Sequence, residues 1–463
     1  MPGMDTYDAI MLLSYGGPNG PDDVLPFMRN ATRGRGIPDE RLLQVAAHYK
    51  RFGGVSPINA CNQRLIADLS AELGRRGHDI PVGWGNRNWH PFVTEGLDEL
   101  AQAGARRILV LPTSAYASYS GCRQYREDLA EAAEALRDKW GTIILGAEDS
   151  ADNPDADIVL DKVRPYYSTP GMASAQITSV RRAWEALTAR GVEASGIRMI
   201  FVTHSIPVSM EAGSSPFPFR PSTDEAAAAS DGHVEQQGSE ASSPAGTPAT
   251  EISYVAQHHA LIQAIMPELR RVLGRADLGY DLVYCSRSGP PQARWLEPDI
   301  NDFLDEIAGD AASDATAPSG VVVVPIGFIC DHMEVVYDLD TEANETAARL
   351  GVPYERADTV STDPDFVSSL VDVLEERAAQ ARGENPARVT VTGTGPFHTV
   401  CPSDCCLSPA CPGHPAPAAG GAHPGAVSAP HSSGAPARAA GQPAITQEDS
   451  MSTPHPHAVV PPE

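Results

Sequence analysis

Four short apolar runs, separated by longer segments of helical periodicity, constrain the fold of this 463-residue chain more than any other feature of its sequence. The runs span residues 9–13, 108–111, 199–202 and 321–326. Each has the length of a strand rather than a helix, and its unbroken apolar character is typical of a strand that is covered on both faces. We therefore expect four buried, parallel β-strands.

Amphipathic segments lie between these runs. Apolar side chains recur every three to four residues across residues 65–73, 125–136, 177–187 and 261–272. The first of these segments is expected to end at Gly74, because glycine commonly terminates a helix. Alternation of strands and helices predicts doubly wound α/β domains with parallel sheets, and the chain length suits two such domains.

Two stretches interrupt the alternation. Residues 212–249 are rich in Ser, Pro, Ala, Gly and Glu, and residues 412–463 are rich in Pro, Ala, Gly and His. Such compositions bury too little apolar surface to offset the entropy of ordering, so both are predicted to be disordered. We expect a first domain at residues 7–190, completed by residues from about 360 to 395. A second domain, interrupted by the insertion, is expected at 195–358, and a cysteine-rich segment follows at 396–411.

Charge and hydropathy exclude several classes of partner. The formal net charge is −26, which disfavours a general nucleic-acid or anionic-membrane surface. No apolar run approaches the ~20 residues of a membrane span. The first five residues lack the basic and apolar regions of a secretory signal. We expect a cytoplasmic protein that neither binds nucleic acid nor inserts stably into a membrane.

Polar groups follow each apolar run. The carboxyl ends of parallel strands share one edge of a sheet, which is where ligands bind in such folds. Tyr15 follows the first run, Ser118 lies in the loop after the second, and His204 follows the third. The segment from Cys330 to Glu342 follows the fourth. Neither a dinucleotide fingerprint nor a phosphate-binding loop is present, so nucleotide binding is not supported.

Glu334, Asp338 and Glu342 are spaced at i, i+4 and i+8. On a helix this spacing stacks the carboxylates along one face, about 6 Å apart per step. Like charges at this spacing repel, so the pattern does not serve helix stability, whereas hard oxygen ligands suit a divalent metal. A solvated acidic helix start is the alternative. His204 alone could be structural, but a histidine paired with Glu334 can accept protons near neutral pH.

A basic island spans residues 32–36 and 48–57 of this acidic chain. Arginine forks bind carboxylates in two-point contacts, so the island could hold an acidic ligand. An ordinary exposed basic loop is the alternative.

Half of the eight cysteines fall within eleven residues, at Cys401, Cys405, Cys406 and Cys411. That density of cysteines is typical of an iron–sulfur site, and a zinc knuckle is the alternative metal site. In a cytosolic chain, metal or redox chemistry is favoured over disulfides. The remaining Cys61, Cys285 and Cys330 are therefore expected to be small buried residues.

Several motifs together resemble those of the ferrochelatases. In order along the chain they are Leu13 to Pro18, Phe52 to Asn59, Gly85 to Trp89, Thr203 to Pro207, Ser286 to Gln292 with Trp295 to Pro298, and Gly327 to Asp340. The C-terminal cysteines and the turn at Tyr15 are similar to those of actinobacterial-type enzymes that insert iron into coproporphyrin III.

The resemblance implies two Rossmann-like domains with the porphyrin between them. His204 matches the histidine that faces the porphyrin, where it accepts pyrrole protons or binds iron, and Glu334 matches its acidic partner. Asp338 and Glu342 match outer carboxylates of a metal or proton path. The implied reaction is insertion of Fe²⁺ into coproporphyrin III in haem synthesis, possible upstream and downstream partners being other enzymes of that pathway. Protoporphyrin IX as substrate, a non-catalytic haem or metal carrier, and a cobalt or nickel chelatase remain alternatives.

The resemblance also implies substrate contacts and a cofactor. Tyr15 matches a tyrosine beside the porphyrin, and the further substrate-binding positions are Arg33, Arg35, Ser56, Ser118 and Tyr125. The chain departs from the family where it carries His48 in place of an arginine and Arg33 one position from the expected one. A [2Fe-2S] cluster is implied on Cys122, Cys401, Cys406 and Cys411. Cys405 is left as a spare, or as a substitute for Cys401 or Cys406.

Overall fold

The computed structural model describes residues 3–33, 36–146, 156–214, 253–287, 293–309, 317–401, 405–406 and 408. These residues belong to one compact unit that extends to Gly421. Beyond residue 214, the insertion predicted at 212–249 lies outside the described residues, as does the whole of the tail predicted at 412–463.

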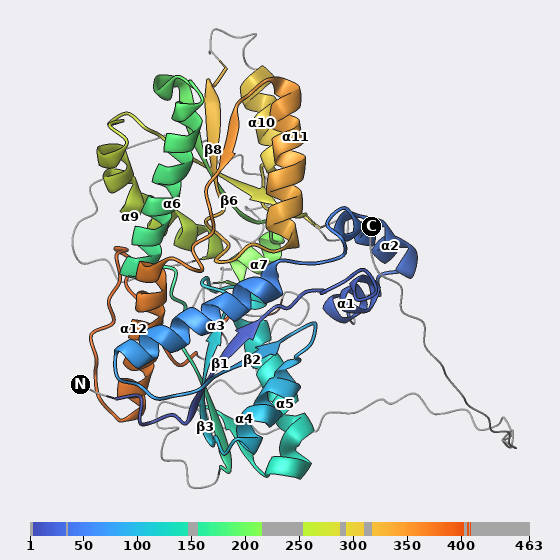
Figure 1. The fold of residues 1–463 in the computed structure, drawn as a ribbon, viewed down its shortest axis with the longest axis vertical. Helices are drawn as coiled ribbons and strands as arrows, with labels where there is room; N and C mark the ends of the chain where they lie inside the picture. Colours follow the sequence, from blue (N-terminus) through green and yellow to red (C-terminus); the bar gives the residue numbers. More distant parts are fainter. Residues whose placement is uncertain are drawn as a thin grey trace, which may run out of the picture. The chain divides into compact units, whose positions relative to one another are not determined.

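Two parallel sheets form the framework (Figure 1). The first has five strands in the order β2-β1-β3-β5-β4, and the second has four in the order β7-β6-β8-β9. Their bounds are β1 Ala9–Ser14, β2 Val82–Asn86, β3 Arg107–Pro112, β4 Ile143–Leu145, β5 Ile158–Lys162, β6 Ile197–His204, β7 Asp281–Cys285, β8 Gly320–Val324 and β9 Tyr354–Arg356. The predicted α/β class with two parallel sheets is confirmed, and the four predicted runs are β1, β3, β6 and β8.

Helices cover both faces of each sheet, which explains the unbroken apolar runs. In β1, Ile10 and Leu12 join the core under α3 and α12, while Met11 and Leu13 join the core under α4 and α5. In the second sheet, α6 and α9 cover one face, and α10, η5 and α11 cover the other. The helix bounds are α3 Ile58–Arg75, α4 Val93–Gln102, α5 Gln124–Trp140, α6 Pro170–Ala189, α9 Tyr254–Val272, α10 Ile300–Gly309, η5 Val335–Ala343, α11 Asn344–Leu350 and α12 Pro364–Ala381.

A helical pair stands apart from the sheets. Helices α1 (Val24–Ala31) and α2 (Asp39–Lys50) share a small core of their own around Phe27 and Leu42. The remaining short helices are η1 (Tyr119–Arg123), η3 (Ala194–Gly196) and α7 (Val208–Ala212).

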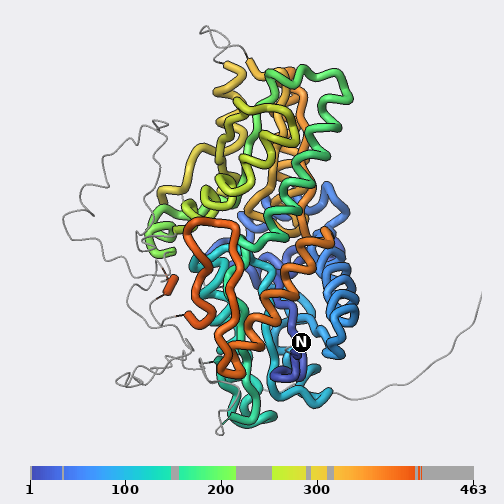
Figure 2. The backbone as a smooth tube through the Cα atoms, turned by 90° about the vertical axis from the view of Figure 1, so that its left-hand side faces the viewer, coloured from blue at the N-terminus to red at the C-terminus, as the bar shows by residue number. Residues whose placement is uncertain are grey.

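After α11 and β9, the chain returns to the first sheet. Helix α12 packs on α3 and α6, and Arg164 before α6 forms a buried ion pair with Glu376 of α12 at 2.8 Å. The segment beyond α12, orange to red in Figure 2, runs back along the molecule, and the amide of Val391 donates to the Ser168 carbonyl at 2.8 Å. The domain boundaries given above stay a prediction.

Three expectations about local structure were wrong. Helix α3 does not end at Gly74 but continues to Arg75, and Gly77, with a φ of +86°, makes the left-handed turn instead. Strand β8 ends at Val324, because Pro325 has no N–H to continue the ladder. Cys61 and Cys330 are buried, as expected, but they form a disulfide, whereas Cys285 is buried and free.

Candidate active site and cysteine site

His204 occupies the last position of β6, so the buried strand fixes its backbone while its ring extends beyond the sheet edge. Its Nδ1 lies 2.5 Å from the Ser205 carbonyl, which identifies Nδ1 as the protonated, donating nitrogen. Its Nε2 lies 3.4 Å from Oε1 of Glu334. The structure therefore brings the two residues predicted as a pair into contact.

Glu334 lies in the loop after β8, immediately before the helix η5. Its backbone amide donates to Nδ1 of His332 at 3.2 Å, and its carboxylate lies 3.8 Å from the same nitrogen. Two histidines thus flank one carboxylate, whose side chain keeps 45% of its surface exposed. A half-exposed carboxylate can exchange ligands with solvent.

The electrostatics of the pair favour its ionised form. Burial by itself would lower the pKa of His204, but the Glu334 carboxylate raises that pKa to about 9. Burial would raise the pKa of Glu334, but the charge of His204 holds it at about 2. Without iron, the pair at neutral pH is an imidazolium beside a carboxylate.

Asp338 and Glu342 lie in η5, which is a π-helix and not the regular helix that the spacing suggested, and Glu334 is its N-cap residue. Turns of this kind are frequent at functional sites. Burial raises the pKa of Asp338 to about 7, with Glu334 and Glu342 adding to the rise and a hydrogen bond from Ser286 opposing it. Glu334 and Glu342 therefore both act electrostatically on Asp338, and the predicted metal or proton path stays a prediction.

Ser286 begins one of the motifs that carry the family resemblance, but it was not predicted to be a site residue. It follows β7 and has a φ of +65°, unusual for a residue with a side chain, and its hydroxyl donates to Asp338. Strain of this kind is retained where the surroundings fix it, often at functional sites.

A second group of candidate site residues consists of aromatic side chains and Arg87. Tyr15, directly after β1, is 41% exposed and packs edge-on against Phe27 of α1. The guanidinium of Arg87 lies 5.9 Å from the centre of the Tyr15 ring and 4.7 Å from that of Tyr125. Tyr125 is only 4% exposed, so Arg87 separates it from the surface that Tyr15 presents.

The other predicted substrate ligands differ in accessibility. Arg33 is exposed, with one guanidinium nitrogen 3.5 Å from Oδ1 of Asn30, while Arg35 lies outside the described residues. Ser56 is 4% exposed and closely approached by Gly17, where a Cβ would lie 2.7 Å from that of Ser56. Ser118 is 2% exposed, and its hydroxyl caps η1 by accepting from the Gly121 amide at 2.8 Å.

Two residues of α2 reach the site without having been predicted to do so. Glu334, Tyr15 and Asp338 all add to the effect of burial in raising the pKa of Tyr49, so Tyr49 interacts electrostatically with all three. His48 stacks on Tyr337 of η5, with ring centres 4.0 Å apart. The basic island of the sequence included both residues, but only tertiary packing shows which side chains face the carboxylates.

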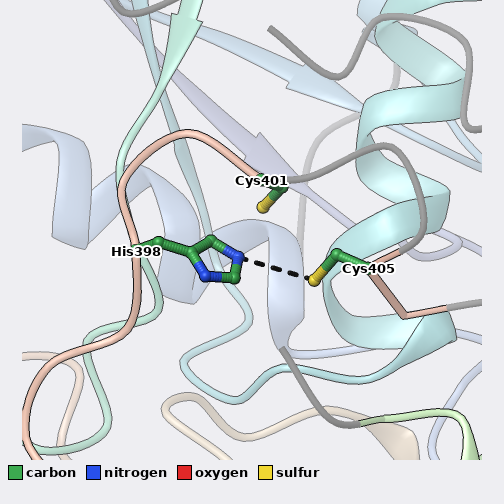
Figure 3. A group of neighbouring side chains, drawn as sticks. All are labelled: His398, Cys401 and Cys405. Carbon is green, nitrogen blue, oxygen red and sulfur yellow. Dashed lines mark hydrogen bonds between the residues drawn. The ribbon is translucent and has the colours of Figure 1, made fainter. Parts of the chain in front are cut away.

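A second cluster forms where η1 meets the C-terminal segment. Cys122, Cys401, Cys405 and Cys406 are all free and buried. The sulfur of Cys405 lies 3.6 Å from that of Cys406 and 3.6 Å from Nε2 of His398 (Figure 3). The ligand atoms of His398, Cys401 and Cys405 lie within 4.8 Å of one another.

Cys122 belongs to the same cluster. Contact with Cys401 and burial raise the pKa of Cys122, although contact with Cys406 opposes them. Among the predicted cluster ligands, Cys122, Cys401 and Cys406 are thus brought together, and Cys411 lies outside the described residues. Cys405, left as a spare by the sequence, lies among them.

Comparison with known proteins identifies the class. The strand-end histidine and the carboxylates near it are groups that can accept protons and bind a divalent metal. The ferrochelatase family model matches residues 7–378, so the chain belongs to the ferrochelatase family and is a lyase that acts on iron and a porphyrin. The resemblance seen in the sequence is confirmed.

Several similar relatives share one description. Proteins called coproporphyrin III ferrochelatase from Streptomyces coelicolor and Streptomyces griseus are 43% and 44% identical over 90% of this chain and 96% of their own length. One of the same description from Leifsonia xyli is 43% identical over 86% of this chain and 91% of its own. Within the described residues, no helix is both long and apolar enough to cross a membrane.

Proposed function

We propose that this enzyme inserts Fe²⁺ into coproporphyrin III, with His204 and Glu334 as the pair that handles protons and metal. The contact of 3.4 Å between Nε2 of His204 and Oε1 of Glu334, at the end of β6, carries the proposal. The printed names of the relatives, at 43–44% identity, support the choice of porphyrin.

The chemistry requires a proton acceptor and a weak metal ligand. The two pyrrole N–H bonds of the porphyrin break and release two protons as its four nitrogens bind Fe²⁺. In the metal-free pair, Glu334 stabilises the protonated His204. Fe²⁺ that binds Glu334 shares its negative charge, which lowers the pKa of His204 and frees Nε2 to accept a pyrrole proton. Asp338, with a pKa of about 7, can pass protons to solvent.

Iron delivery is assigned to the carboxylates of η5. Fe²⁺ keeps a hydration shell, and carboxylates bind it without the near-permanent hold of thiolates. We propose that Glu342 and Asp338 pass the ion inward to Glu334. Tyr337 packs between His48 and Glu342 and so joins α2 to the outer end of this path.

The porphyrin side of the site is a matching proposal. The exposed ring of Tyr15 would lie against the macrocycle, with Arg87 behind it and Tyr125 supporting Arg87. Arg33, Arg35, Ser56 and Ser118 are proposed to hold propionates. Four propionates demand more such contacts than the two of protoporphyrin IX. Contacts with the enzymes that precede and follow this step in haem synthesis are likewise proposed.

The test is anaerobic metal insertion by the purified full chain, with Fe²⁺ and either coproporphyrin III or protoporphyrin IX. The expected result is turnover of coproporphyrin III that is lost in His204→Ala. Turnover of protoporphyrin IX at an equal or higher rate would overturn the substrate assignment. Porphyrin binding without turnover of either would make the protein a carrier. As a control, His90→Ala removes an exposed histidine paired with Glu95 and should leave the rate unchanged.

We also propose that the cysteine site holds a [2Fe-2S] cluster through Cys122, Cys401, Cys405 and Cys406. Four buried free thiols with mutual contacts suit the four-cysteine ligation of such clusters. A buried guanidinium, Arg126, adjoins them and would offset the charge of the thiolates. When bound, the cluster would link η1 to the C-terminal segment covalently. Iron insertion itself transfers no electron, so the proposed role is structural or regulatory.

A further inference from the structure

We infer that Arg126 is a positioning residue of the cysteine site, whose guanidinium donates hydrogen bonds to a bound [2Fe-2S] cluster and raises its reduction potential. This inference rests on the cluster proposed above. It concerns a side chain that neither the family match nor the names of the relatives assign to any role.

The local fold delivers Arg126 to the cysteines. It follows Cys122 by four residues, and η1 runs directly into α5, so the two side chains lie about one turn apart on the same side. Both are buried, with 4% of each residue exposed. The guanidinium therefore cannot reach solvent to satisfy its donors.

Arg126 has hydrogen-bond donors that lack an acceptor among the described residues. One terminal nitrogen, Nη2, lies 3.4 Å from the carbonyl of Cys405. Within the part of the chain that the structure describes, its Nε and Nη1 have no hydrogen-bond acceptor. A buried charge with unpaired donors is costly, and native structures avoid it unless a ligand or ion completes the site.

Among the described residues, no uncommitted carboxylate lies beside Arg126. Arg126 and Cys401 line a small cavity together with Asp161, Lys162 and Arg377. Asp161 is already engaged by Arg377 at 3.0 Å and by the Tyr7 hydroxyl at 2.6 Å. Three cations therefore face one committed carboxylate, which leaves the thiolate sulfurs as the negative charge that Arg126 can serve.

The consequence is a shift in redox behaviour. Reduction adds one electron to the cluster and breaks no bond, so it increases the negative charge beside Arg126. A fixed positive charge and N–H donors stabilise the reduced form more than the oxidised one, which raises the potential. Removing the charge should lower it.

The experiment compares the full chain with Arg126→Gln, Arg126→Lys and Arg137→Gln after anaerobic reconstitution with iron and sulfide. Arg137 lies on the same helix, is 63% exposed and pairs with Glu134, so it controls for loss of one charge from α5. Iron and sulfide content, the visible spectrum and the midpoint potential against a dithionite titration are measured.

We expect Arg126→Gln to shift the potential downward by at least a tenfold change in equilibrium constant, which is about 59 mV for a one-electron couple. Arg126→Lys keeps the charge but loses the fork of donors and should shift the potential less, in the same direction. Arg137→Gln should match the unmodified protein.

The outcomes separate this inference from the cluster itself. Unmodified protein without iron and sulfide would overturn the cluster and the role of Arg126 with it. A cluster whose potential is unchanged in Arg126→Gln would overturn the role of Arg126 alone. If Arg126→Gln does not retain the cluster, Arg126→Lys decides: a lowered potential supports the inference, and an unchanged one overturns it.

Discussion

The proposed catalytic site at His204 and the proposed cluster site at Cys122 are built in opposite ways. The His204 site uses nitrogen and oxygen groups that follow strands, and the side chain of Glu334 is 45% exposed. The cysteine site uses buried sulfur groups, and it brings η1 together with a segment nearly three hundred residues later in the chain.

The difference follows from what each site must do with iron. A substrate ion must be received and released within one turnover, so exposed carboxylates with adjustable protonation suit it. A resident ion must stay, and buried thiolates bind iron tightly and shield it from water. The two proposed iron sites therefore differ in the exposure of their donor atoms, which are partly exposed at Glu334 and buried at the cysteines.

The largest expected effect is on iron insertion in Glu334→Gln, and unchanged insertion in this variant would contradict the proposed role of the His204 site. We expect this change to reduce the rate of insertion about 10²- to 10⁴-fold, the range for loss of a group that assists proton transfer. Single-turnover insertion, followed by the porphyrin spectrum, measures it. Glu345→Gln is the matched control, because Glu345 is 64% exposed and only pairs with Arg51. Cluster iron should be unchanged in both variants.

At the cysteine site, Cys405→Ser and Cys411→Ser separate the two candidate ligand sets. We expect Cys405→Ser to lose the cluster absorbance and most of its sulfide, and Cys411→Ser to keep both. Serine preserves size but not the soft sulfur donor. The opposite result would restore Cys411 as a ligand and return Cys405 to the position of a spare thiol.

A smaller and more specific effect is expected on the ionisation of the His204–Glu334 pair. In Glu334→Gln, the pKa of His204 should fall from about 9 toward its ordinary value near 6.5, as seen by NMR titration of the iron-free protein. An unchanged pKa would show that the charge of Glu334 does not govern His204.

The same pair should stabilise the fold over a defined pH range. The raised pKa of His204 gives stability that is complete below about 6.5 and is lost as the pH rises through about 9. The lowered pKa of Glu334 gives stability that is complete above about 4.5 and is lost as the pH falls through about 2. The difference in unfolding free energy between the unmodified protein and Glu334→Gln should therefore be largest between these limits, near pH 5 to 6.

The smallest expected effect concerns the outer end of the metal path. Glu342→Gln should raise the KM for Fe²⁺ roughly threefold with kcat unchanged, since one partly exposed charge contributes under about 1 kcal/mol. Steady-state kinetics over a range of Fe²⁺ concentrations measure it. A fall in kcat with KM unchanged would instead place Glu342 at the chemical step.

The central strands and the His204–Glu334 pair could be predicted because their signals are local. Strands β1, β3, β6 and β8 are covered on both faces and therefore read as continuous apolar runs. Strand β2 lies at a sheet edge and contains Gly83 and Gly85, and β9 has only three residues, so neither gives that pattern. His204 and Glu334 both follow predicted strands, which placed them at the edge where ligands bind.

What the sequence did not reveal depends on contacts between distant segments. Cys61 and Cys330 are 269 residues apart, and no spacing rule pairs them. Tyr49 reaches the carboxylates only because α2 packs toward η5. The π-helical geometry of η5 could not be inferred from the i, i+4, i+8 spacing, which a regular helix would also satisfy.

The return of the chain to its first sheet has a consequence for synthesis. Helix α12 completes the core around α3, and three of the four clustered cysteines lie beyond it, so these cysteines leave the ribosome after the residues of both sheets. Since folding proceeds as the chain emerges, the nascent protein can form its second sheet before the proposed cluster ligands are all available. Iron capture at the cysteine site would then mark a chain whose C-terminal segment has reached η1.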